Sequence, residues 1–369
     1  MKLRSLHIED YKLFKDFNID FLDSDDKPLP IVILAGVNGS GKTTLLEYID
    51  NFVAYLESKR VPLGSDFIEF NARIHQEKGL VPANQIPFTN HTININNFKE
   101  YPFNNFKEYR EIYKEDIVYF PVNKNNMLDL KESILRRYRL LARKSSHLEA
   151  LENIQKFIAT IFEGLEINLT ISDINDIDRT NELVTFENSS GNTFEIEALS
   201  TGEKTLFSKA LYLYFKDYKE KVILIDEPEL SLHPSWQNRV LKIYENFAKI
   251  SDCQIIIATH SPHIITSADN ESIRFLEKNE EGNITVIKDI QAYGRDMEWV
   301  LQQMGVKNLR VSEVLEKFTH CQQLLNDEKY DEAEKAIDEL ENIIGENDKE
   351  ILALRNDLAF ERIDFEEDN

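Results

Sequence analysis

The sequence predicts an α/β fold in which a mostly parallel sheet is covered by helices. Three short apolar runs, at residues 31–36, 222–225 and 255–258, have the continuous hydrophobicity of buried parallel strands. The first two runs lead through a loop into a helical pattern, which is the unit that builds parallel sheets. The opening residues alternate between apolar and polar, and they predict an antiparallel hairpin that turns between residues 10 and 15.

The rest of the chain divides by pattern into a head and three additions. Residues rich in Asn, Pro, Phe and Tyr predict loops with some strand, whereas apolar residues at helical spacing predict helices before Gly164 and near the C-terminus. The expected parts are a head formed by residues 1–59, 117–126 and 165–310, an insertion at 60–116, an α-helical subdomain inserted at 127–164, and an acidic all-α tail at 311–369 that contains a hairpin.

Charge is distributed unevenly along the 369 residues. The net charge is −23, and residues 311–369 contribute −13 of it. Such acidity repels nucleic acid at long range, so contact with DNA or RNA needs a local basic surface or a partner. Residues 131–144 form one basic stretch with six basic side chains and one acidic. This stretch is either a solvated helix face or a contact for nucleic acid or a partner.

Neither a membrane span nor a secretory signal is evident in the sequence. No apolar stretch approaches the roughly 18 residues of a spanning helix, and the N-terminus lacks the apolar region of a signal peptide. Cys253 and Cys321 are far apart and lack metal-ligand spacing. We therefore expect a cytoplasmic protein with no membrane partner and no disulfide.

A glycine-rich loop follows the first buried run. Residues 36–43 read GVNGSGKT and match the pattern G-x-x-x-x-G-K-[ST], with a strand before and a helix after. Polyphosphate needs backbone N–H groups that approach closely, and glycines permit that approach. A lysine adds a cation, and the threonine hydroxyl is a Mg²⁺ ligand. The candidate residues for binding the nucleotide are Asn38, Gly39, Ser40, Gly41, Lys42, Thr43 and Thr44.

Three further motifs lie between residues 199 and 260. Asp226 and Glu227 end the second buried run; Asp226 fits a role in holding Mg²⁺, and Glu227 fits a role in activating water. A strand that simply ends in solvated acids is the alternative. LSTGEK at 199–204 places a serine and a glycine at a helix start, which forms an anion site. His260 follows the third run and is either a γ-phosphate contact or a structural histidine.

These motifs, in this order, resemble the head of ATP-binding-cassette (ABC) ATPases. The resemblance rests on residues 1–50 and 195–265 and implies ATP and Mg²⁺ as cofactors, with Thr43 and Asp226 at the metal. It also implies that Ser200, Gly202 and Glu203 form the signature, which closes over the nucleotide held by a second copy. The active unit would then be a head-to-tail homodimer, with Glu227 and His260 catalytic and residues 228–234 at the dimer contact.

Details of the motifs favour one branch of that family. Transporter motors read LSGGQ and DEPTxxLD, whereas this chain reads LSTGEK and DEPELSLHP. The second pattern is similar to overcoming-lysogenization-defect (OLD) ATPases, RecF-like ATPases and SMC heads. In those heads a basic residue corresponding to Lys12 often lies beside the nucleotide. The glutamine that usually follows the strand at 116–122 is not evident, since Gln85 lies elsewhere and Asn123 occupies that place.

Features of the C-terminal part suggest a partner. The chain lacks both a long heptad arm and the acidic motifs of a TOPRIM nuclease, so we expect no nuclease activity of its own. Residues 293–306 and the following hairpin resemble ATPases of Septu-type anti-phage systems, which implies a separate HNH-type nuclease partner. The tail is alternatively a packing element of the dimer. Two other functions stay open. One is a DNA-repair ATPase of the RecF or SMC sort, and the other is a structural scaffold with weak turnover in which ATP only stabilises an oligomer.

Overall fold

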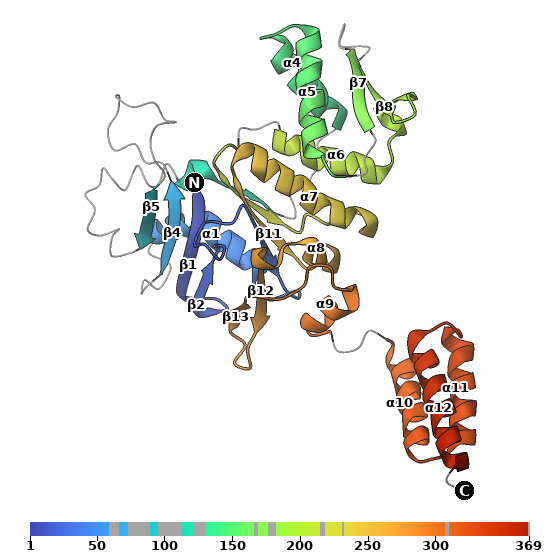
Figure 1. Ribbon diagram of the computed structural model, residues 1–369. Helices are drawn as coiled ribbons and strands as arrows, with labels where there is room; N and C mark the ends of the chain where they lie inside the picture. The colour runs from blue at the N-terminus through green and yellow to red at the C-terminus, as the bar shows by residue number, and fades with distance from the viewer. Residues whose placement is uncertain are drawn as a thin grey trace. The chain divides into compact units, whose positions relative to one another are not determined.

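Two compact units make up the chain, and each is described by itself (Figure 1). The first unit comprises Met1–Val300 and the second Leu301–Asn369. The computed structural model describes residues 1–58, 66–72, 89–94, 113–121, 130–165, 169–175, 182–214, 218–230, 232–306 and 310–367. Within these ranges, no helix is both long and apolar enough to cross a membrane.

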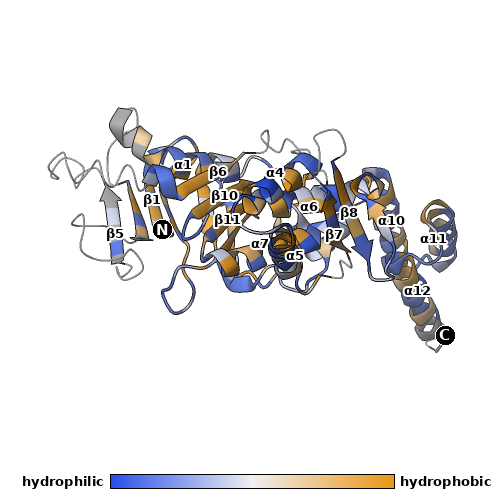
Figure 2. Cartoon of the chain, turned by 90° about the horizontal axis from the view of Figure 1, so that it is seen from above, coloured by the Kyte–Doolittle hydropathy of each residue, from blue (hydrophilic) through white to orange (hydrophobic). Residues whose placement is uncertain are grey.

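A six-stranded sheet forms the centre of the first unit. Its order is β13-β12-β3-β11-β10-β6; all neighbours are parallel except β13, which pairs antiparallel with β12. Strands β10 and β11 are hydrophobic along most of their length (Figure 2), as buried central strands must be. This arrangement confirms the predicted α/β fold with a mostly parallel sheet. The strands are β3 (Ile31–Ala35), β6 (Ile117–Phe120), β10 (Val222–Asp226), β11 (Gln254–Thr259), β12 (Ile273–Lys278) and β13 (Ile284–Ile287).

The N-terminal hairpin belongs to a second, antiparallel sheet of order β2-β1-β4-β5. Its turn lies at Lys12 and Leu13, as predicted, because Tyr11 pairs with Phe14. Two strands from the stretch expected to be an insertion complete the sheet, with β4 next to β1. That stretch therefore contributes strands to the sheet that the hairpin begins. The strands are β1 (Lys2–Tyr11), β2 (Phe14–Asp20), β4 (Phe67–Ala72) and β5 (Thr89–Asn94).

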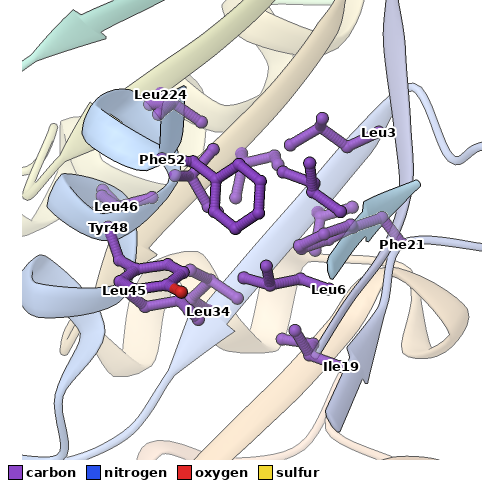
Figure 3. Close-up of a cluster of buried hydrophobic side chains, with 14 of the residues drawn as sticks. Leu3, Leu6, Ile19, Phe21, Leu34, Leu45, Leu46, Tyr48, Phe52 and Leu224 are labelled. Atoms are coloured by element: carbon purple, nitrogen blue, oxygen red, sulfur yellow. The ribbon is translucent and has the colours of Figure 1, made fainter. Parts of the chain in front are cut away.

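One large hydrophobic cluster joins the two sheets through helix α1 (Lys42–Ser58). Helix α1 packs on the central strands from one side, and α7 (Pro234–Ser251) packs on β3 and β11. Burying each large side chain of the cluster contributes about 1.5–3 kcal/mol. This core fixes the start of α1, and with it the glycine-rich loop, against the sheet. Figure 3 labels ten members of the cluster: Leu3, Leu6, Ile19, Phe21, Leu34, Leu45, Leu46, Tyr48, Phe52 and Leu224.

A buried amide also ties the N-terminal hairpin to the parallel sheet. Gln254 is fully buried at the start of β11. Its Oε1 accepts from the N–H of Leu3 at 2.7 Å, and its Nε2 donates to the carbonyls of Leu3 at 3.1 Å and Leu29 at 3.0 Å. Both N–H groups of the amide and its oxygen are thus hydrogen-bonded, so the amide is buried without the free-energy cost of an unsatisfied polar group.

The predicted helices and meander follow in the first unit. The capping box of Ser146 and Glu149 explains where α5 begins, and Gly164, at φ +76°, lies just after it. The elements are α4 (Leu130–Ala142), α5 (His147–Ile161), β7 (Leu169–Asn175), β8 (Leu183–Asn188), β9 (Thr193–Glu195), η3 (Ile196–Ala198), α6 (Thr201–Tyr214), α8 (Pro262–Ser267), η4 (Asn270–Ser272) and α9 (Met297–Gln303). Strands β7, β8 and β9 form a three-stranded sheet.

The second unit is a bundle of α10 (Ser312–Asn326), α11 (Tyr330–Ile344) and α12 (Lys349–Glu367) with its own buried core. The all-α hairpin predicted at 311–369 corresponds to α11 and α12, and α10 adds a third helix that packs on both. Gly345 ends α11 at φ +93°, and Asp348 caps α12 by accepting from the N–H groups of Glu350 and Ile351. Arg310 donates to both carboxylate oxygens of Asp348.

Candidate functional site

The glycine-rich loop joins β3 to α1. At three of its positions the backbone has a conformation that only glycine adopts without strain. Gly36, Gly39 and Gly41 all have positive φ, at +148°, +80° and +86°. A Cβ on Gly36 would lie 2.4 Å from the carbonyl oxygen of Leu276, and one on Gly41 would lie 3.0 Å from the ring of Phe14. The first contact is shorter than real Cβ contacts allow. The loop therefore brings bare backbone to the N-terminus of α1, as an anion site requires.

Lys42 is buried at the first position of α1, with 6% of its surface exposed. Its Nζ donates to the carbonyls of Gly36 at 2.7 Å and Val37 at 2.8 Å, so it closes the loop on itself. Burial lowers the pKa of Lys42, while nearby carboxylates, Glu227 first among them, oppose that shift. The lysine is thus a buried donor at the centre of the predicted phosphate site. Of the other loop residues, Asn38 and Thr43 are exposed, and Thr44 is half-buried.

Asp226 ends β10 and lies 1% exposed beside this loop. Its carboxylate accepts a hydrogen bond from the Thr43 side chain, and Tyr119 Oη on β6 lies 3.5 Å from its Oδ2. Burial raises the pKa of Asp226. Its Oδ1 is buried without a hydrogen-bond partner among the described residues. A buried carboxylate oxygen beside a hydroxyl fits Mg²⁺, which prefers oxygen ligands.

Glu227 follows Asp226 with a backbone φ of +47°, a region that L-residues seldom occupy. Its N–H donates to the carbonyl of Ala258 on β11 at 2.8 Å, which holds this turn. His260 Nδ1 lies 3.0 Å from Glu227 Oε1. The two residues predicted to be catalytic come from the ends of neighbouring parallel strands, and the structure brings them into hydrogen-bond contact.

Ser200, Gly202 and Glu203 form a closed turn at the start of α6. The N–H and Oγ of Ser200 donate to Glu203 Oε2 at 2.8 and 2.7 Å, and the N–H of Glu203 lies 3.3 Å from Ser200 Oγ. This arrangement is a capping box. Gly202 lies against the indole of Trp236, since a Cβ there would be 2.8 Å from Nε1. Within the described ranges, the side-chain hydrogen bonds of Ser200 and Glu203 stay within the turn.

One position singled out in the sequence, Lys12, remains a prediction as a neighbour of the nucleotide. It lies in the β1–β2 turn at φ +53°, with its Nζ 3.9 Å from Glu47 Oε2 on α1 and about half its side chain exposed. Gln85 and Asn123 lie outside the described residues. Tyr119, which reaches Asp226, was missed because nothing in its local sequence marks it.

Models of two protein families match the chain. Residues 1–119 match an AAA ATPase domain, and residues 84–266 match an AAA domain described as a putative AbiEii toxin of a type IV toxin–antitoxin system. Together they cover all the motifs described above.

Curated proteins of the same kind are also similar. A probable ATPase of retron Vc95 from Vibrio cholerae is 30% identical over 47% of this chain and 36% of its own length. An OLD nuclease from Thermus scotoductus is 23% identical over 77% of this chain and 63% of its own length. The Septu protein PtuA of Bacillus thuringiensis is 31% identical over 31% of this chain and 29% of its own length. The chain thus spans less than two thirds of each relative. By its motifs, its sheet and these matches, the chain is similar to AAA- and ABC-type ATPases, and the curated proteins that it resembles include OLD and Septu proteins.

Proposed function

We propose that the chain binds ATP with Mg²⁺ and hydrolyses it at Glu227. The observation that carries this proposal is the contact of 3.0 Å between Glu227 Oε1 and His260 Nδ1, at the strand ends next to Lys42 and Asp226. A carboxylate held by a histidine beside a phosphate loop is suited to accept a proton from an attacking water.

Each group has a separate role in this reaction. The loop N–H groups and Lys42 bind the β- and γ-phosphates, and Lys42 Nζ exchanges hydrogen bonds to the carbonyls of Gly36 and Val37 for bonds to phosphate oxygens. Thr43 and Asp226 would hold Mg²⁺, which would supply positive charge to offset that of the phosphates. Glu227 orients the water and takes its proton. His260 orients the Glu227 carboxylate and lies within reach of the γ-phosphate region.

The proposal includes a head-to-tail homodimer. The side chains of Ser200 and Glu203 hydrogen-bond each other, and Thr201 at the start of α6 is exposed. An exposed helix N-terminus is suited to the γ-phosphate of a nucleotide held by the phosphate loop of a second copy. The cleft between the two copies would be a site that neither copy completes alone.

The wider role that we propose is control of a partner nuclease of the HNH type in anti-phage defence, in the cytoplasm. The similarity to PtuA and to a retron ATPase supports this role. Direct action on DNA is the second candidate. Exposed Arg136, Arg143 and Lys144 on and after α4 favour it, whereas the net charge of −23 opposes it.

The test combines turnover with molecular mass from light scattering. Glu227→Gln keeps the size of the side chain but removes the base, so we expect ATP binding without hydrolysis and a dimer that is stable in ATP and Mg²⁺. Glu245→Gln, at a half-buried residue of α7 whose carboxylate lies 3.2 Å from Lys242 Nζ, is the matched control and should behave as wild type. Turnover in Glu227→Gln at the wild-type rate would refute the catalytic role. A monomer at all ATP concentrations would refute the shared site.

A further inference from the structure

A second carboxylate lies behind the Glu227–His260 pair. Glu229 is 4% exposed, although it lies in the loop after β10. Its Oε1 accepts from the hydroxyl of Thr259 at 2.6 Å and from the backbone N–H of His260 at 3.2 Å. Thr259 is the last residue of β11, and His260 is the first residue of the loop that follows it. Glu229 Oε1 therefore holds the backbone at His260, and this backbone sets the direction of the His260 side chain.

The hydroxyl of Thr259 also links this contact to the next residue. Its Oγ1 accepts from the N–H of Ser261 at 3.0 Å while it donates to Glu229. Ser261 in turn donates to Gln237 Oε1 on α7 at 2.6 Å. The loop that carries His260 is thus held on both sides. Loss of Glu229 leaves two buried donors unsatisfied at once.

The charge of Glu229 has a counterpart on α6. Its Oε2 is buried without a hydrogen-bond partner in the described part of the chain. Lys209, on the helix that begins at the Ser200 turn, has its pKa lowered to about 8 by burial, and Glu229 is the group that opposes this shift. Buried charges of opposite sign offset each other's desolvation. No direct ion pair joins Glu229 to Lys209 within the described ranges.

We propose that Glu229 is a positioning residue for ATP hydrolysis, which holds His260 in contact with Glu227. The inference rests on the proposed function, because it concerns the rate of that reaction. Glu229 makes no hydrogen bond to Glu227 or to the phosphate loop in the described residues, but its Oε1 lies 3.7 Å from His260 Nδ1, and its charge also opposes the lowering of the Lys42 pKa. The proposed effect passes through His260, and a double-mutant cycle with His260 distinguishes it from an effect on Lys42 or on folding.

The test is a double-mutant cycle on turnover. Glu229→Ala should lower kcat at least about tenfold, since displacing a catalytic group by about 1 Å costs up to about a hundredfold. The KM for ATP should stay near that of wild type, whereas the melting temperature should fall somewhat, because Thr259 and His260 lose their shared acceptor. Glu229→Gln keeps one acceptor oxygen and should recover part of the loss. In a His260→Ala background, Glu229→Ala should cause little further loss, because residues that act as a unit are not additive.

If Glu229→Ala does not fold, Thr259→Val removes one of its two donors and should give the same selective loss of kcat.

Three results separate the two proposals. Wild type that hydrolyses no faster than Glu227→Gln would overturn both. Active wild type together with unchanged kcat in Glu229→Ala would overturn only the positioning role. A loss in Glu229→Ala that multiplies in full with that of His260→Ala would also overturn the positioning role, because it would then not act through the histidine.

Discussion

Replacing Gly202 by alanine tests whether the signature glycine is required by packing within one chain. Gly202 is not among the glycines with positive φ, so alanine is not excluded by its backbone. The new Cβ would lie 2.8 Å from Nε1 and 3.1 Å from Cδ1 of Trp236. The indole is held in turn by Arg239, whose guanidinium carbon lies 4.8 Å from the ring centroid. Helix α6 or the indole must therefore move.

The expected cost follows from two opposing effects. Overpacking of this kind costs about 1–3 kcal/mol, whereas alanine in place of glycine in a helix returns about 0.5–1 kcal/mol. The net destabilisation of Gly202→Ala is then about 0–2.5 kcal/mol, with a central value of about 1 kcal/mol. A loss of about 1 kcal/mol lowers the melting temperature of a large unit by about 2–4 °C.

Thermal unfolding followed by circular dichroism, without nucleotide, measures this effect separately from any contact with a second copy. Gly202→Ala in a Trp236→Phe background is the matched comparison, since the smaller ring leaves room for the methyl group. There the substitution should cost less than in wild type. A melting temperature of Gly202→Ala at or above that of wild type would refute the reasoning, and so would an equal loss in both backgrounds.

Three further outcomes follow from buried polar groups. Arg274→Met should destabilise the first unit by about 3 kcal/mol in chemical unfolding, since its 3% exposed guanidinium holds Asp20 at 2.9 Å; a loss below about 1 kcal/mol would contradict this. Gln254→Met should cost about 1–3 kcal/mol, because it leaves backbone groups of β1 unpaired, and a neutral effect would show that water replaces the amide. Burial raises the pKa of Cys253 to about 12 and also raises the pKa of Cys321, so thiolate is scarce at pH 8, and a maleimide at that pH should label neither cysteine until its unit unfolds. Labelling of either cysteine in native buffer would refute that protection.

Much of the site was predictable because its residues follow continuous apolar runs. A buried parallel strand must be apolar on both faces, and the carboxyl ends of such strands meet at one edge. Asp226 and His260 each follow such a run, so their proximity could be inferred without the strand order. The capping of α12 by Asp348 was also predictable from local sequence, since the capping carboxylate and the N–H group that it accepts from are only two residues apart.

Contacts that depend on strand order or helix packing could not be predicted in this way. Tyr119 reaches Asp226 because β6 pairs with β10, and the two residues are 107 positions apart. Gly202 meets Trp236 only because α6 packs on α7. Strand β4 extends the N-terminal sheet, although the composition around it is that of a loop. In each case the partner is specified by the fold and by no local pattern.

The backbone at Glu227 decides which substitution tests the proposed chemistry cleanly. A left-handed conformation costs a residue with a Cβ roughly 1–2 kcal/mol, and here the hydrogen bond to Ala258 and the adjoining strand hold it in place. Gln has the same backbone cost as Glu, so Glu227→Gln alters only the proton acceptor. Glycine would relieve the strain and alanine would remove the contact with His260. A loss of turnover in either of those variants would therefore combine a change in the turn with a change in chemistry, whereas the glutamine variant isolates the chemistry.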